Sequence, residues 1–350
     1  MQHQISWNEG TGTTVSNVRI PTLKALKIPR YWCNEEKIGT ILGSIADKIA
    51  LNTQTNQTLE QIAQAIFKSW FVDFDPVKAK MTALAAGGSR EDAERAAMCA
   101  ISGKDESALD AMQREQPAAY AELAATAALF PAAMRASELG DVPEGWGVGE
   151  IGQEVEVIGG STPSTKNADF WERGNIHWTT PKDLSNLTDK ILIDTDRKIT
   201  DLGLKEISSG LLSVNTVLMS SRAPVGYLAI NKIPLAINQG YIAMRCNGRL
   251  SPEYVLQWAN SVMDEIKQRS SGTTFAEISK KNFRTISVIV PDAGVIELFS
   301  DKVSKLYDAI TENLFQTKSL TELRDSLLPK LLSGEIDLSN LPDNINEANA

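Results

Sequence analysis

The sequence contains very little histidine and cysteine, and this scarcity excludes several classes of catalytic and metal site. Its 350 residues include only two histidines, His3 and His177, so few residues could serve as a histidine base or a histidine metal ligand. The three cysteines, Cys33, Cys99 and Cys246, form no Cys-x-x-Cys pair, which argues against a disulfide framework and a zinc site. We therefore expect a reducing compartment and no metal in this chain.

Long apolar runs and nucleotide-binding loops are missing as well. No stretch of about 20 apolar residues occurs, and no signal-like apolar run follows the start, so we expect a cytoplasmic protein that does not enter a membrane. No phosphate-binding GxxxxGK[ST] loop is present. A GxGxxG match at 147–152 follows a turn-rich stretch instead of a buried strand, so we reject it as a dinucleotide site. An enzyme is not expected.

An overall excess of basic charge is also absent, since the formal net charge is -9. The acidity lies in two segments, 83–144 and 291–350, which each hold five basic and eleven acidic residues. Residues 145–290 hold sixteen basic and fifteen acidic residues. A nearly neutral region can still present a basic face to DNA, so the charge permits a nucleic-acid partner without proving one.

An internal repeat is the most informative feature that is present. Gly12-Thr-Thr-Val precedes a helical pattern with Ile45-Ala-Asp-Lys-Ile49, and Gly272-Thr-Thr-Phe precedes Phe299-Ser-Asp-Lys-Val303. The copies are offset by 254 residues at first and by 261 further on, a difference of seven. One added heptad keeps the apolar stripe on the same helix face, as a coiled coil requires.

The two copies predict two long amphipathic helices that pack antiparallel as spacers. The second, from roughly 296 to 332, would be about 55 Å long at about 1.5 Å per residue. Asn52 and Asn56 lie in the first apolar stripe and mark either paired, register-setting positions or an exposed stretch. The residues predicted to form the hydrophobic seam and to contact partners are Ile45, Ile49, Leu59, Ile66, Val303, Leu306, Ile310, Leu320 and Leu327.

Two different regions separate the helices. Residues 83–140 are rich in alanine, and we interpret them as a helical insertion or linker without a function of its own. Residues 141–291 combine tryptophans with short β-branched runs, such as Ser213-Val-Asn-Thr-Val-Leu-Met219, and predict a mixed α/β domain.

Polar loops in this mixed domain supply the residue types that contact DNA. Hydroxyls, backbone amides and lysines suit phosphates, arginine suits a guanine edge, and amide side chains suit adenine. Each loop alone is also compatible with an ordinary surface turn, and Trp178 is expected in the core. The candidate DNA-binding residues are Ser161, Thr162, Ser164, Lys166, Thr179, Thr180, Lys182, Ser220, Ser221, Arg222, Asn238, Gln239, Thr273, Thr274, Lys280 and Lys281.

Taken in order, these segments resemble the specificity (S) subunits of type I restriction-modification systems. The resemblance rests on the motifs at 139–146, 160–166, 178–184, 199–204, 220–226, 238–240, 272–275 and 323–336. It covers nearly the whole chain apart from the Ala-rich segment and the tail. Most of a first recognition domain should precede Met1, so the chain looks like an N-terminally truncated member of the family.

The resemblance implies an α/β (α+β) fold with one target-recognition domain flanked by two long antiparallel coiled-coil helices. It divides the chain into a remnant of a first recognition domain (1–30), a first spacer helix (35–82), the insertion (83–140), a target-recognition domain (141–291), a second spacer helix (295–338) and a disordered tail (339–350).

It also implies a non-catalytic subunit that directs methyltransferase (M) and restriction/translocase (R) subunits to a site in double-stranded DNA. S-adenosylmethionine, Mg and ATP are then expected on those partners and no cofactor in this chain. A second copy of the chain is a further candidate partner. One alternative is a fragment that binds methyltransferase subunits without productive DNA recognition. Another is a stand-alone methyltransferase or nuclease.

Overall fold

The computed structural model describes residues 24–25, 35–271 and 276–338. The predicted remnant at 1–30, the tail at 339–350, and Thr273 and Thr274 therefore lie outside the described residues, apart from residues 24 and 25. The chain divides into two compact units, 1–51 with 317–350 and 52–316, which we call the terminal unit and the central unit. Each is described by itself.

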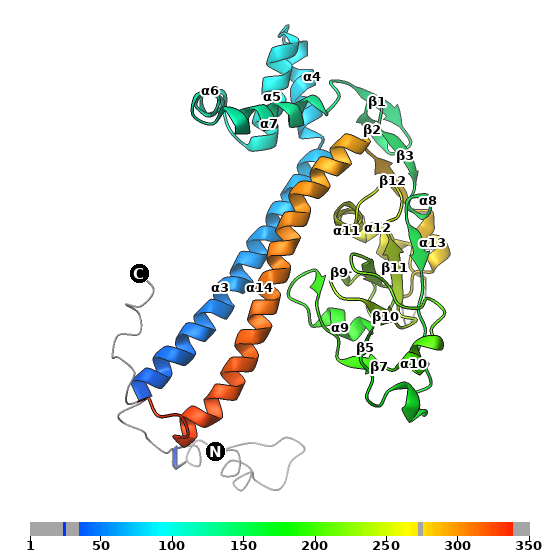
Figure 1. The fold of residues 1–350 in the computed structure, drawn as a ribbon. Coiled ribbons are helices and arrows are strands. Elements are labelled where there is room, and N and C mark those ends of the chain that lie inside the picture. The colour runs from blue at the N-terminus through cyan, green and yellow to red at the C-terminus, as the bar shows by residue number, and fades with distance from the viewer. Residues whose placement is uncertain (1–23, 26–34, 272–275, 339–350) are drawn as a thin grey trace. The chain divides into compact units, whose positions relative to one another are not determined.

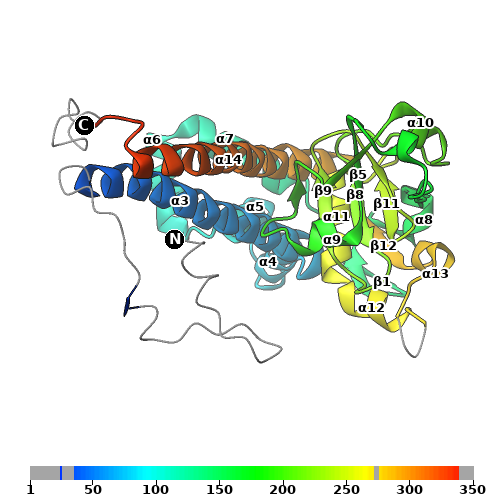
Figure 2. The same cartoon turned by 90° about the horizontal axis from the view of Figure 1, so that it is seen from below.

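Two long helices, α3 (Glu35–Phe67) and α14 (Ala293–Ser333), dominate the fold. Within each unit they lie side by side in both views (Figures 1 and 2). In the terminal unit, Ile38 near the start of α3 packs with Leu331 near the end of α14, so the helices run antiparallel there. In the central unit, Phe67 at the end of α3 contacts Phe299 near the start of α14, which gives the same direction. The predicted antiparallel pair is confirmed.

The predicted hydrophobic seam follows the packed faces of these helices. Ile45, Val303 and Ile310 are buried, and Val303 and Ile310 share the largest core with Ala63 and Phe67 of α3. The remaining six seam residues, Ile49, Leu59, Ile66, Leu306, Leu320 and Leu327, are half-buried.

Asn52 and Asn56 are buried in the seam, with side chains 2% and 1% exposed. The Nδ2 of Asn52 donates to Gln316 Oε1 at 2.8 Å, and the Nδ2 of Asn313 donates to Asn56 Oδ1 at 2.9 Å. A polar pair inside an apolar seam loses its hydrogen bonds when the helices slip. The structure therefore favours the register-setting interpretation over the exposed one.

The helix predicted for residues 35–82 ends sooner than expected. After Phe67 the backbone widens into a π-helical turn, Lys68–Val72, and Phe74 then adopts a left-handed conformation with φ 56°. A new helix, α4 (Asp75–Ala85), begins with Pro76 in its first turn, where proline is tolerated.

The Ala-rich segment folds into three more helices with a small core of their own. They are α5 (Arg90–Ser102), α6 (Glu106–Glu115) and α7 (Pro117–Ala128). Ser89 and Asp92 form a capping box at the start of α5, and Gly103 ends it in a left-handed conformation. The core of this segment consists of Ala97, Met98, Leu109 and Ala127.

A five-stranded sheet forms the centre of the mixed domain, in the order β4 (Glu156–Ile158), β11 (Tyr241–Arg245), β8 (Val217–Ser220), β9 (Leu228–Asn231), β6 (Ile191–Leu192). Alternate residues of its strands point to opposite faces. Val217 and Met219 of β8 join the largest core, whereas Leu218 joins a second core on the other face. Because both faces are covered, the central strands are mostly apolar and buried.

Smaller sheets and short helices complete the domain. β10 (Leu235–Ile237), β5 (Ile176–Thr179) and β7 (Arg197–Ile199) form a three-stranded sheet, β12 (Ser287–Val290) pairs with β3 (Gly147–Glu150), and β1 (Met134–Ser137) pairs with β2 (Gly140–Pro143). The helices are α8 (Ile151–Glu154), η2 (Ala168–Phe170), α9 (Pro181–Ser185), α10 (Asp201–Lys205), α11 (Pro252–Ser261), α12 (Met263–Gln268) and α13 (Lys280–Arg284).

An aromatic cluster joins the mixed domain to the helix pair within the central unit. Phe71 lies at its centre, with ring centroids 4.9 Å from Tyr254 of α11, 5.1 Å from Phe299 of α14 and 5.8 Å from Trp146. The other members are Phe67, Trp70, Phe74 and Phe130. Edge-to-face rings of this kind add to the stabilisation from apolar burial. The mixed domain and the helices therefore share one core.

Candidate nucleic-acid interface

The predicted DNA-contacting loops meet on one rim of the mixed domain. The loop after β4 lies against the end of β10, because Ser161 N donates to Ile237 O at 3.1 Å and Thr162 Oγ1 donates to Gln239 Oε1 at 2.6 Å. A Cβ added to Gly160 would lie 1.9 Å from Ile237 O, so only glycine permits this close approach.

Further backbone hydrogen bonds connect the other loops to this point. Asn238 N donates to Thr179 O at 3.1 Å, and Ser221 N donates to Gly240 O at 2.8 Å. Ile278 N in turn donates to Ser221 O at 3.0 Å. Lys280 then reaches back to the first loop, where its Nζ lies 2.6 Å from the position of a Cβ built on Gly159. Segments distant in sequence thus form one continuous rim.

Asp183 fixes the position of the loop that carries Lys182. Its Oδ2 accepts from Thr180 N at 2.7 Å and Thr180 Oγ1 at 3.0 Å, and its Oδ1 accepts from Asp196 N at 2.8 Å. The Lys182 side chain is 76% exposed, and its Nζ lies 3.5 Å from Asp196 Oδ2. The carboxylate therefore orders the backbone while the cation stays available at the surface.

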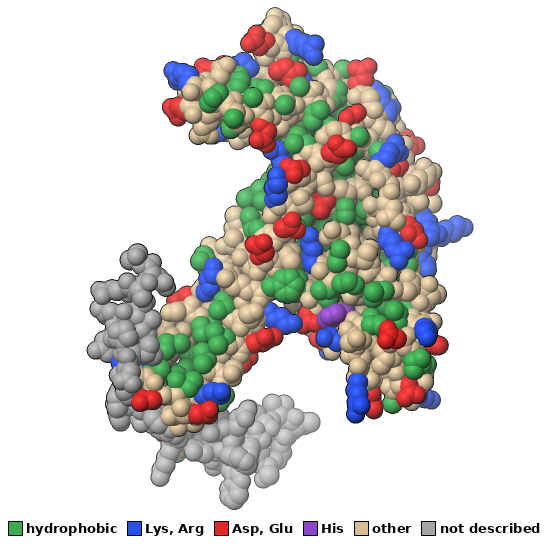
Figure 3. Space-filling view, viewed as in Figure 1, with side chains coloured by type: hydrophobic (Ala, Val, Ile, Leu, Met, Phe, Trp, Pro, Cys, Tyr) green, Lys and Arg blue, Asp and Glu red, His purple; other side chains and the backbone are tan. Residues whose placement is uncertain are grey.

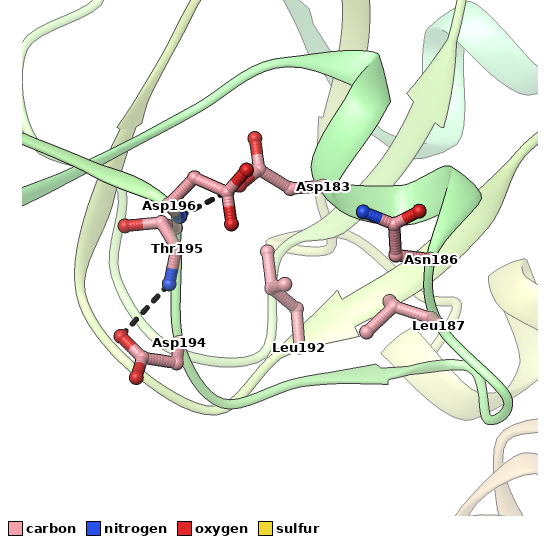
Figure 4. Close-up of a pocket in the computed structure, with 7 residues that line it drawn as sticks. All are labelled: Asp183, Asn186, Leu187, Leu192, Asp194, Thr195 and Asp196. Atoms are coloured by element: carbon pink, nitrogen blue, oxygen red, sulfur yellow. Dashed lines mark hydrogen bonds between the residues drawn. The ribbon is translucent and has the colours of Figure 1, made fainter. Parts of the chain in front are cut away.

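A cavity of about 230 Å³ lies beside this carboxylate (Figure 4). The carboxylates of Asp183, Asp194 and Asp196 line this cavity and would repel an anionic ligand such as a phosphate. Among the residues that the structure describes, no group of three or more His, Cys, Asp or Glu side chains could hold a metal ion. The lining residues are Asp183, Asn186, Leu187, Leu192, Asp194, Thr195 and Asp196.

Three predicted contact residues lie in the interior, which corrects their expected role. Thr179 and Ser220 have no exposed surface, and Ser221 is 3% exposed. Ser220 Oγ donates to Pro224 O at 2.7 Å, and Thr179 Oγ1 lies 3.0 Å from the hydroxyl of Tyr241. The hydroxyls of Thr179 and Ser220 and the backbone of Ser221 make hydrogen bonds in the interior, so these residues hold the loops in place and do not face DNA.

Tyr241 supports the same loop from beneath. Its hydroxyl donates to Thr180 O at 2.6 Å, and burial raises the pKa of this tyrosine well above its ordinary value. The hydroxyl therefore stays protonated and remains a donor at neutral pH.

The other predicted residues within the described chain lie at or near the surface of the rim. Arg222 is 39% exposed, with its Nη1 3.8 Å from Glu277 Oε2, a long and weak ion pair that leaves the guanidinium free to exchange partners. Thr162, Ser164, Lys166, Lys182, Gln239, Lys280 and Lys281 are exposed, and Ser161, Thr180, Arg222 and Asn238 are half-buried.

Two basic residues on β7 were not among the predicted contacts. Arg197 and Lys198 are exposed, on the strand that pairs with β5 just before Lys182. The Arg197 guanidinium stacks 3.6 Å from the ring centre of Trp171, which itself packs on the buried Trp178, as expected for a core tryptophan. The two consecutive basic residues, Arg197 and Lys198, are the sequence feature that could have indicated a DNA contact here.

Basic and acidic side chains are interspersed over the face shown in Figure 3, in agreement with the near-neutral count for residues 145–290. On this face, electrostatic attraction to a polyanion would come from individual exposed cations and not from a broad basic surface. Among the described residues, no helix is long and apolar enough to cross a membrane.

Comparisons with known proteins agree with this organisation. The family model described as type I restriction modification DNA specificity domain matches residues 143–317. The HindI specificity subunit of a type I restriction enzyme from Haemophilus influenzae is 38% identical over 310 residues, which cover 86% of this chain and 67% of that protein. The MjaIX specificity subunit from Methanocaldococcus jannaschii is 33% identical over 189 residues, 53% of this chain and 44% of that protein.

A crystal structure of a type I restriction-modification S subunit from M. genitalium also aligns, with a TM-score of 0.49 and 16% identity, over 94% of this chain and 69% of that one. The family assignment rests on the sequence matches, which include the loops of the rim. By these matches, the chain belongs to the type I restriction-modification DNA specificity family.

Proposed function

We propose that this chain recognises a DNA sequence on behalf of a type I restriction-modification complex and carries out no chemistry itself. The observation that carries the proposal is the rim, where hydrogen bonds join five polar loops of the matched family region around exposed Lys182 and Lys280 and half-buried Arg222. Such a scaffold holds side chains that suit phosphates beside side chains that suit base edges.

Each exposed group has a role that follows from its chemistry. Lys166, Lys182, Lys280 and Lys281 suit phosphate oxygens, because their ammonium groups are exposed point charges. Arg222 can exchange its weak pair with Glu277 for two hydrogen bonds to guanine O6 and N7.

The partners in this proposal are double-stranded DNA, methyltransferase subunits and a restriction/translocase subunit, with the seam helices as docking elements. In this proposal S-adenosylmethionine, Mg and ATP act on those partner subunits, and the complex works in the cytoplasm. A second copy of the chain would supply a second recognition domain related by twofold symmetry.

Co-expression with the cognate methyltransferase subunit, followed by mapping of methylated adenines, tests the function directly. We expect one defined sequence motif. Arg222→Ala is expected to relax discrimination at particular base positions by about 1–3 kcal/mol, whereas Lys182→Ala weakens binding to all sequences and lowers its salt dependence. Lys305→Ala is the matched control, because Lys305 lies on α14, is 70% exposed and pairs within its own helix with Asp301.

Two results would contradict the proposal. Co-purification with the methyltransferase subunit without any sequence preference would favour an interaction-only fragment. Binding of S-adenosylmethionine or a catalytic metal by the isolated chain, measured by calorimetry, would favour an enzyme. If Arg222→Ala, Lys182→Ala and Asn238→Ala all bind like the Lys305→Ala control, the assignment of the rim is wrong.

A further inference from the structure

The edge of the five-stranded sheet carries two lysines that contact the helix pair. Lys190 directly precedes β6, and Lys232 directly follows β9, the strand that pairs with β6. Backbone hydrogen bonds of 2.9 Å, from Ile230 N to Lys190 O and from Lys232 N to Leu192 O, hold both lysines at this edge.

Each lysine contacts a different helix. Lys190 Nζ lies 3.5 Å from Glu60 Oε1 on α3, and Lys232 Nζ lies 3.1 Å from Asp308 Oδ1 on α14. Neither lysine side chain is more than 22% exposed, although Asp308 is 65% exposed. Lys190 is itself oriented by a hydrogen bond of 2.7 Å to Asn260 Oδ1 on α11.

A buried glutamine completes the contact between these elements. Gln257 on α11 is 2% exposed, and its Nε2 donates to Glu60 Oε1 at 3.1 Å and to the Tyr307 hydroxyl at 2.6 Å. One amide thus touches both helices between the two ion pairs. Glu60 is further held by Gln64, whose Nε2 donates to the same oxygen at 2.8 Å.

These polar contacts lie away from the aromatic cluster along both helices. Glu60 precedes Phe67 by seven residues, and Asp308 follows Phe299 by nine, which place the ion pairs about 10 Å or more from the cluster along each axis. The shared apolar core continues along the helices, to Ala63 of α3 and to Tyr307 and Ile310 of α14, so the ion pairs lie beside this core at the edge of the sheet. Ion pairs and hydrogen bonds require a specific geometry of their partners, which the burial of apolar surface does not, so these contacts suit the control of orientation.

We infer that Lys190 and Lys232 form a two-point ionic clamp that fixes the rotation of the recognition domain about the helix pair. This inference rests on the proposed function for its consequence in DNA recognition. The two lysines are positioning residues, because they act on DNA through the angle at which the rim is held. Loss of the clamp should leave the bases recognised unchanged and relax the spacing at which they are accepted.

A distance measurement tests the clamp in the full chain without relying on DNA. Spin labels are placed at Glu172→Cys in the recognition domain and Glu312→Cys on α14, both exposed positions, after Cys33, Cys99 and Cys246 are replaced by alanine. We expect a narrow distance distribution that broadens or shifts in Lys190→Met/Lys232→Met. Lys190→Arg/Lys232→Arg should retain the narrow distribution, because the charges remain.

Lys305→Met is the matched control, since Lys305 forms its ion pair with Asp301 of the same helix. The double Met variant should melt below this control, because Glu60 loses its cationic partner, so the distances are measured well below both melting temperatures, where both variants are folded. A distribution in the double Met variant equal to that of the control would overturn the clamp.

Mapping of methylated adenines then tests the consequence. With the clamp removed, we expect the same bases in the motif but acceptance of altered spacing between its parts. If the wild-type chain directs no methylation, the proposed function is wrong. The distance measurement would still show whether Lys190 and Lys232 fix the orientation of the domain. A broadened distance distribution with unchanged spacing would overturn the positioning role.

Discussion

Truncation of Phe71 to alanine is expected to weaken the shared core of the central unit strongly. Phe71 is 4% exposed and packs against Phe67, Trp70, Trp146 and Tyr254, with a fifth ring, that of Phe299, 5.1 Å away. Its removal leaves a cavity bordered by rigid rings, which cannot collapse to fill it.

The size of the effect follows from this burial. Replacement of a core phenylalanine by alanine costs about 3–5 kcal/mol. A unit of this size loses about 2 °C of melting temperature per kcal/mol, so we expect a decrease of about 6–10 °C. The neighbouring Val72 is 45% exposed, and Val72→Ala should cost no more than about 0.5 kcal/mol, or about 1 °C.

Differential scanning calorimetry of the full chain measures both variants in the same buffer. The two substitutions are adjacent in the same π-helical turn, so they share any effect on local backbone conformation. Equal melting temperatures for Phe71→Ala and Val72→Ala would refute the shared core, and with it the attachment of the recognition domain to the helices.

Three further predictions follow from individual contacts. Asn56→Leu should lower the free energy of unfolding in urea by about 1–3 kcal/mol, because the Asn313 side chain loses its acceptor. Asn56→Leu/Asn313→Leu should recover most of that loss. A double variant less stable than the single one would contradict this. Gly160→Ala should abolish specific DNA binding with unchanged circular dichroism, since the new methyl group would meet Ile237 O; wild-type binding would show that the loop tolerates it. Burial raises the pKa of Cys246 to about 12, so at pH 8 only about one thiol in ten thousand is ionised, and alkylation in the native protein should be far slower than in urea; equal rates would contradict its burial.

The helix pair could be predicted from sequence because its signal repeats. A seven-residue difference between the two copies, together with Asp47-Lys48 and Asp301-Lys302 at equivalent positions, is enough to indicate two related helices. The end of the first helix could not be predicted. It depends on a π-helical turn and on Phe74 at positive φ, and tertiary packing imposes both against local preference.

The rim was predicted as a set of loops more reliably than as a set of side chains. Hydroxyl residues occur in turns and in contacts alike. The hydroxyls of Thr179 and Ser220 proved to bond buried groups that only the folded chain brings near them, and Ser221 proved to be buried as well. Arg197 was overlooked although Lys198 follows it directly, because its stacking on Trp171 joins residues 26 positions apart and only the folded chain shows it.

The two ends of the helical segment between Asp75 and Phe130 lie close together. Trp70 and Phe130 have ring centroids 5.2 Å apart, and the buried Lys80 ammonium donates to Phe130 O at 2.8 Å while pairing with Glu94 at 2.8 Å. An excursion whose two ends are pinned together can gain or lose length without moving the elements on either side. This closure makes the segment a natural point for grafting a reporter or an affinity module into the chain.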